Sequence, residues 1–129
     1  MEGVIKNFKI SEFYCHDVNQ TKIPAEYIDN VNELMLNLQV LRDELGVPVH
    51  ISSGYRTPEH NKKIGGAKRS FHLKAMAADI YTDEYSASEV HKTIQRLIDE
   101  GKMKEGGLGK YRTFTHYDVR DYKARWDKT

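Results

Sequence analysis

The stretch Ser70-Phe-His-Leu-Lys-Ala-Met-Ala-Ala-Asp79 carries an imidazole at position 72 and a carboxylate at position 79. Its apolar second half continues through Ile80 and predicts a buried strand over residues 76–81. His72 then lies in a loop that can fold back toward Asp79 at the strand. An imidazole and a carboxylate at this spacing are a weak indication of a metal site, so a third ligand has to come from elsewhere in the chain.

A third ligand is offered by the segment Phe-Thr-His-Tyr-Asp-Val-Arg at residues 114–120, which predicts a strand over 114–119. Alternation along a strand places His116, Asp118 and Arg120 on one face. Such a face is too polar for ordinary core packing, because buried charges must be paired or bound to metal. An Asp118–Arg120 ion pair beside a solvated imidazole is the simpler alternative. Together with the first stretch, His116 predicts a site for one zinc ion with three protein ligands and a fourth position for water, the arrangement of catalytic zinc sites.

The rest of the chain surrounds these two strands with helices. Apolar residues recur at helical spacing over residues 24–45, and Gly46 is a natural end. Ser86 and Glu89 form a capping box that opens a helix through residue 100. We predict an α+β fold in one domain spanning residues 1–129, with two main helices packed on a small, mainly antiparallel sheet. Further predicted elements are a short helix over 58–63, short strands at 8–10, 47–52 and 108–111, and a tail over 121–129 in which Trp126 covers one end of the core.

Charge and composition argue against several classes of protein. Lys and Arg number 20 against 19 Asp and Glu, and the resulting net charge of +1 does not suggest nucleic-acid binding. Cys15 is the only cysteine, so no internal disulfide forms, and a buried structural thiol is expected. No window is apolar enough for membrane insertion, and no signal-peptide h-region is visible, which predicts synthesis in the cytoplasm.

A loop arginine adds a second chemical group near these strands. Arg56 follows Ser53-Gly-Tyr after the predicted strand over 47–52. A guanidinium there can offer a fork of donors to a substrate carboxylate or to an oxyanion. A structural salt bridge to Glu59 is the simpler alternative.

Three separated blocks of sequence carry a family resemblance. Ser53-Gly-Tyr-Arg56 comes first, Gly65-Gly-Ala67 with Ser70-Phe-His72 and Asp79 follows, and His116-Tyr-Asp-Val-Arg120 comes last. This order resembles the zinc D-Ala-D-Ala peptidase family, which includes D-Ala-D-Ala carboxypeptidases, D-Ala-D-Ala dipeptidases and phage L-alanyl-D-glutamate endopeptidases. The resemblance covers roughly residues 8–126 and is closest to the small single-domain members.

The resemblance implies the fold that Hedgehog signalling domains share with D-Ala-D-Ala peptidases. It also implies a role for each matching side chain. His72, Asp79 and His116 become the zinc ligands, and Arg56 becomes the residue that binds substrate and stabilises transition-state charge. Ser70, two residues before the first ligand, and Arg120, in the last motif, become supporting residues of the site.

Two positions depart from the family pattern. Ala75 stands where the family commonly has glycine, and alanine is strained if the backbone there has a positive φ. Thr113 stands where several members have an acid or a histidine as general base. Asp118 is the best replacement as the catalytic base, with orientation of a ligand imidazole as the alternative. Glu59 and His60 are further candidates.

The residues and the resemblance together predict a zinc peptidase that hydrolyses a peptide bond in the peptidoglycan stem peptide, as a carboxypeptidase or an endopeptidase. We expect a monomer that contacts peptidoglycan and neither nucleic acid nor membrane. Release to the cell wall through a phage holin would reconcile cytoplasmic synthesis with this substrate. The alternatives are a zinc-binding domain that binds the cell wall without turnover, and a virion-associated domain with a relict site.

Overall fold

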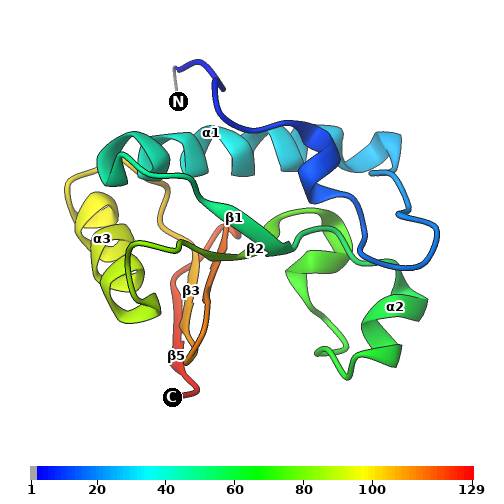
Figure 1. Ribbon diagram of the computed structural model, residues 1–129. Helices are drawn as coiled ribbons and strands as arrows, with labels where there is room; N and C mark the ends of the chain where they lie inside the picture. The colour runs from blue at the N-terminus through cyan, green and yellow to red at the C-terminus, as the bar shows by residue number, and fades with distance from the viewer. Residues whose placement is uncertain (1–2) are drawn as a thin grey trace.

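A five-stranded sheet lies at the centre of the chain, of which the computed structural model describes residues 3–129. The strand order is β1-β2-β4-β3-β5, and every neighbouring pair is antiparallel except β3 and β5. The strands are β1 (His50–Ser53), β2 (Ala77–Tyr81), β3 (Gly107–Lys110), β4 (Thr115–Asp118) and β5 (Ala124–Asp127). The predicted α+β fold with a mainly antiparallel sheet is therefore confirmed (Figure 1).

The long helix α1 (Ile28–Leu45) crosses the top of the molecule in Figure 1 and contacts β2. It buries Leu34, Leu38 and Leu41, which recur at helical spacing. Gly46 ends the helix in the left-handed conformation, with a φ of 69°, and its N–H donates to the carbonyl of Arg42 at 3.0 Å. The helix predicted over 24–45 is confirmed, except that its first turn is the 3₁₀ helix η2 (Ala25–Tyr27). Neither α1 nor any other helix within residues 3–129 has the length and apolar character needed to cross a membrane.

Side-chain caps determine where the two other helices begin. At the start of α3 (Ala87–Asp99), the Ser86 hydroxyl accepts the N–H of Glu89, and the Glu89 carboxylate accepts the N–H of Ser86. The Thr57 hydroxyl caps the short helix α2 (Pro58–Lys63) by accepting the N–H of His60. Figure 1 shows α3 and α2 at opposite ends of the molecule. Both helices begin where the sequence predicts them.

The first and last segments of the chain differ from the sequence prediction. Residues 8–10 form no strand, because the Glu12 carboxylate accepts the N–H of Lys9 and stabilises the 3₁₀ helix η1 (Ile10–Phe13) instead. The tail forms β5, which pairs in parallel with β3 and places Trp126 opposite Gly109. Trp126 is not part of the hydrophobic core, so the prediction that it covers a core end is wrong. Pairing of the tail satisfies the backbone groups of the β3 edge.

Candidate metal centre

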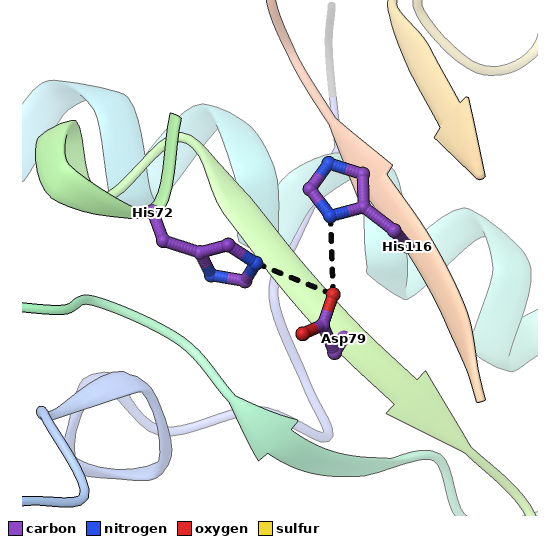
Figure 2. A group of neighbouring side chains, drawn as sticks. All are labelled: His72, Asp79 and His116. Atoms are coloured by element: carbon purple, nitrogen blue, oxygen red, sulfur yellow. Dashed lines mark hydrogen bonds and ion pairs between the residues drawn. The ribbon is translucent and has the colours of Figure 1, made fainter. Parts of the chain in front are cut away.

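Three buried side chains from separate elements meet at one point of the sheet. Asp79 on β2 and His116 on β4 are direct partners across the antiparallel pair. His72 comes from the 3₁₀ helix η3 (Phe71–Lys74), where the Ser70 hydroxyl accepts the N–H of His72 at 3.2 Å. One possible ligand atom from each of the three lies within 4.8 Å of the others. The side chains predicted as zinc ligands are therefore brought together (Figure 2).

Hydrogen bonds on the far side of each ring determine which nitrogen faces Asp79. The Nδ1–H of His72 donates to the carbonyl oxygen of Gly54 at 2.7 Å, which leaves Nε2 facing Asp79 Oδ1 at 3.2 Å. The Nε2–H of His116 donates to Asp118 Oδ2 at 2.7 Å, which leaves Nδ1 facing the same Asp79 oxygen at 3.1 Å. Figure 2 shows both nitrogens pointing at this one oxygen. In each neutral ring, the nitrogen that faces Asp79 carries a lone pair and no hydrogen.

The charges at this point favour a cation between the three side chains. Burial lowers the pKa of His72, so its ring is neutral at neutral pH. Burial alone would raise the pKa of Asp79, but the contacts with His116 and His72 outweigh it and lower the pKa, so the carboxylate is ionised. A ring lone pair and an anionic oxygen 3.2 Å apart repel each other, and a divalent cation between them removes that repulsion. Two imidazole nitrogens and a carboxylate oxygen are also a usual donor set for catalytic zinc, so these residues fit the metal.

His116 differs from His72 because two carboxylates face it. Burial lowers the pKa of His116, but contacts with Asp118 and Asp79 outweigh burial and raise it above its ordinary value. In the absence of metal, the ring can therefore hold a proton on Nδ1 against Asp79. Metal binding has to displace that proton, since a ligating imidazole is neutral.

Arg56 holds the second oxygen of Asp79. Its Nη2–H donates to Asp79 Oδ2 at 3.1 Å, while its Nε–H donates to Ser53 Oγ at 3.0 Å and its Nη1–H to Asn61 Oδ1 at 3.2 Å. The guanidinium is mostly buried, with 13% of the side chain exposed. Among residues 3–129 its ionic partner is Asp79, so the alternative salt bridge to Glu59 is not formed.

Asp118 lies behind His116 and is fully buried. The Arg120 guanidinium donates to both of its oxygens, at 2.8 and 2.7 Å, and the N–H groups of Gly107 and Arg120 donate to Oδ1 at 3.0 and 3.1 Å. Burial alone would raise the pKa of Asp118, but the hydrogen bonds with Arg120 and His116 lower it, so the carboxylate is ionised. Arg120 also lies over the ring of Phe71, 4.3 Å from its centroid. Both Asp118 oxygens are thus engaged by the protein.

A pocket of about 780 Å³ opens over the three clustered side chains. The rings of Tyr111, Phe114 and Trp126 form part of its wall, and the exposed residues Arg69 and Lys128 belong to its lining. The Trp126 ring lies against His116, with centroids 4.9 Å apart. The pocket therefore gives a ligand access to the cluster past an aromatic wall.

The proposed general bases lie away from this pocket. Asp79 is the one carboxylate in its lining within residues 3–129. Asp118 is buried behind His116, and Glu59 and His60 line a separate hollow of about 320 Å³. The structure therefore brings the three predicted ligands together without a free acid beside them.

Sequence patterns did not identify Tyr111 and Trp126 as residues of the site. A signal was available in the run Gly106-Gly-Leu-Gly109, because glycine inside a strand often marks the close approach of another group. A Cβ at Gly107 would overlap the Asp118 carboxylate, and a Cβ at Gly109 would overlap the Trp126 indole. Gly107 and Gly109 thus make room for the Asp118 carboxylate and the Trp126 indole, which lie next to His116.

Comparison with known proteins places this arrangement in a family. A family model described as Peptidase M15 matches residues 6–118. Peptidoglycan L,D-endopeptidase MepK of Escherichia coli (strain K12) and the protein of the same name from Shigella flexneri are each 32% identical to the chain over 79 residues. These matches cover 56% of the chain and 40% of each relative, so the chain matches less than half the length of these curated relatives. Since the family match includes all three clustered side chains and confirms the resemblance seen in the motifs, the chain belongs to the Peptidase M15 family, the zinc D-Ala-D-Ala peptidases.

Proposed function

We propose that this domain is a zinc peptidase that hydrolyses a peptide bond in the stem peptide of peptidoglycan. The observation that carries the proposal is the convergence of His72 Nε2 and His116 Nδ1 on one oxygen of Asp79. Family membership supports peptidase chemistry, and the printed name of the relatives, peptidoglycan L,D-endopeptidase, supports the substrate.

One zinc ion would be held by His72, Asp79 and His116. When bound, it would supply a Lewis acid for the peptide carbonyl and lower the pKa of a water molecule. The protein's own part is to hold the ligands ready. Asp118 keeps the hydrogen of His116 on Nε2, and Arg56 holds the second oxygen of Asp79, which leaves Oδ1 facing the two rings. Among the two roles considered for Asp118, its burial and its engaged oxygens favour orientation of His116 over proton abstraction.

The geometry of Arg56 favours endopeptidase over carboxypeptidase action. A guanidinium has five N–H groups, and Arg56 directs three of its hydrogen bonds to Ser53, Asn61 and Asp79. A free terminal carboxylate is bound best by a guanidinium that presents its open fork. The guanidinium of Arg56 is largely committed, so we propose cleavage within a peptide, in keeping with the name of the relatives.

A second candidate function is zinc-dependent binding of the cell wall without turnover. The absence of a free acid from the pocket lining within residues 3–129 favours it. It differs from the peptidase in one measurable outcome, since such a domain would retain peptidoglycan fragments and leave them intact.

The test is zinc analysis of the purified protein combined with digestion of purified peptidoglycan, with products identified by mass. We expect about one zinc per chain and new amine ends that disappear in the His116→Ala variant. His91→Ala is the matched control, because His91 lies on α3 outside this pocket. Bound zinc without new ends would support the binding domain, and a chain that takes up no zinc would refute the metal centre.

A further inference from the structure

Tyr111 is a pocket residue whose hydroxyl is held in place by two neighbours. It follows β3 at the turn into β4, where its backbone N–H donates to the carbonyl of Phe114 at 3.2 Å. Its ring stacks on Phe114 with centroids 4.3 Å apart and planes inclined by 14°. Its oxygen accepts the Nε1–H of Trp126 at 2.9 Å. The stack fixes the ring, and the indole fixes the position of the oxygen.

The hydrogen of this hydroxyl remains available to a ligand. A phenol can donate one hydrogen bond as well as accept, and Trp126 uses only the accepting side. Within residues 3–129, no protein group accepts the Tyr111 O–H. Arg56, by contrast, directs its donors to Ser53, Asn61 and Asp79. Tyr111 is therefore an uncharged, positioned donor in the wall of the pocket.

One indole connects this donor to the candidate metal centre. The Trp126 ring lies 4.9 Å from the His116 ring, and its Nε1 holds the Tyr111 oxygen. The phenol therefore shares a wall with a metal ligand. Tyr111 and Trp126 both line the pocket that opens over the cluster.

We propose that Tyr111 is a further catalytic residue, whose O–H donates a hydrogen bond to the carbonyl oxygen of the scissile peptide. As water adds to the carbonyl carbon, negative charge grows on that oxygen, and a fixed donor stabilises it. The hydrogen stays on the phenol, so Tyr111 transfers no proton in this step. Trp126 is the positioning residue that sets the direction of the hydroxyl. This inference rests on the proposed peptidase function.

Tyr111→Phe tests the donor directly, because it keeps the ring on Phe114 and removes only the hydroxyl. With soluble peptidoglycan fragments as substrate, we expect kcat to fall about 100-fold, the size of effect seen when one such donor is lost, with KM changed less than about threefold and zinc content unchanged. Tyr85→Phe is the matched control, because Tyr85 lies outside the pocket. This variant should cleave the substrate at the wild-type rate.

A readout without zinc or substrate tests the geometry. Trp126 is the only tryptophan, so the tryptophan fluorescence comes entirely from the residue that holds the Tyr111 oxygen. Tyr111→Phe should shift its emission in the metal-free protein, whereas Tyr85→Phe should not. Trp126→Phe should lower kcat about tenfold, and combining it with Tyr111→Phe should add little to the loss from Tyr111→Phe alone, because both act through one hydroxyl.

The outcomes separate this inference from the proposed function. An active wild-type protein with an equally active Tyr111→Phe variant would overturn the role of Tyr111 and leave the peptidase standing. A zinc-loaded wild-type protein that cleaves no peptidoglycan would overturn both. Unchanged Trp126 emission in Tyr111→Phe would refute the hydrogen bond on which Trp126 depends as a positioning residue.

Discussion

A single hydrogen on His116 decides which of its nitrogens faces Asp79, and Asp118 holds that hydrogen. The same relation holds for His72, whose hydrogen is held by the carbonyl of Gly54. Groups that orient ligand rings tune metal affinity although they never touch the metal. At the scale of residues, the properties of the centre therefore depend on hydrogen-bond partners as much as on ligands.

Asp118→Asn is expected to weaken zinc binding by about 10- to 100-fold. The amide lacks the charge that fixes His116, and Arg120 loses its ionic partner. Competition with a chelator of known affinity measures the change. Asp121→Asn is the control, because the Asp121 carboxylate is 90% exposed and pairs with Lys104, away from the cluster. Unchanged zinc affinity in Asp118→Asn would contradict the orienting role.

At the scale of elements, β5 and β3 form one unit because Trp126 lies over Gly109. Gly109→Ala places a methyl group inside the indole and should destabilise the protein by about 1–3 kcal/mol, the usual cost of overpacking. Trp126 emission should shift with it. Gly3→Ala is the control, since the nearest atom to a Cβ there is 3.9 Å away. Denaturant unfolding followed by circular dichroism measures both variants.

The end of α1 offers a second test at this scale. Gly46 has a φ of 69° and open space around it, so a side chain would meet strain without a clash. Gly46→Ala should lower the free energy of unfolding by about 1–2 kcal/mol, and Gly46→Asn should lower it less, because asparagine tolerates the left-handed conformation. Equal losses in the two variants would show that the backbone conformation is not the cause.

Elements with local signals were predictable, and pairings between distant segments were not. The capping box at Ser86 and the stop at Gly46 are written in a few neighbouring residues, so α3 and α1 follow from the sequence. The suspected strain at Ala75 is present too, with a φ of 57°. β5 was missed because its four residues, Ala-Arg-Trp-Asp, lack a clear alternation, and their pairing with β3 is a nonlocal event.

The residues of the candidate metal centre could be predicted from the sequence, but the hydrogen-bond partners of those residues could not. The motif spacing named His72, Asp79 and His116, which the fold brings within 4.8 Å of one another. The partner of Arg56 could not be chosen from spacing, because Glu59 lies three residues away and Asp79 lies 23 away. Only the folded sheet decides between a local and a distant carboxylate.

At the scale of the whole molecule, the two buried carboxylates of the centre link stability to pH. The pKa values of Asp79 and Asp118 are both lowered from an ordinary value of 3.8, despite burial, by hydrogen bonds from their neighbours. The unfolded chain therefore binds protons that the folded chain does not, so stability is present above about pH 4 and is lost as the pH falls further. Acid titration of the unfolding free energy should show a shallower loss below pH 4 in Asp118→Asn than in the wild type.

Metal binding should also raise the stability of the whole chain. A ligand that binds only the folded state adds about 2.7 kcal/mol when its free concentration is 100 times Kd. Thermal unfolding with zinc and with chelator should therefore differ by several degrees in the wild type. The difference should vanish in His72→Ala, which removes one ligand. A wild-type melting temperature unaffected by chelation would contradict the metal centre.

The separation of the cluster from β5 has a consequence for how this domain can diverge. The indole that lies against His116 comes from β5, which contributes none of the three clustered side chains. Substitutions along β5 can therefore change the shape of the pocket while the donor set of the centre stays the same.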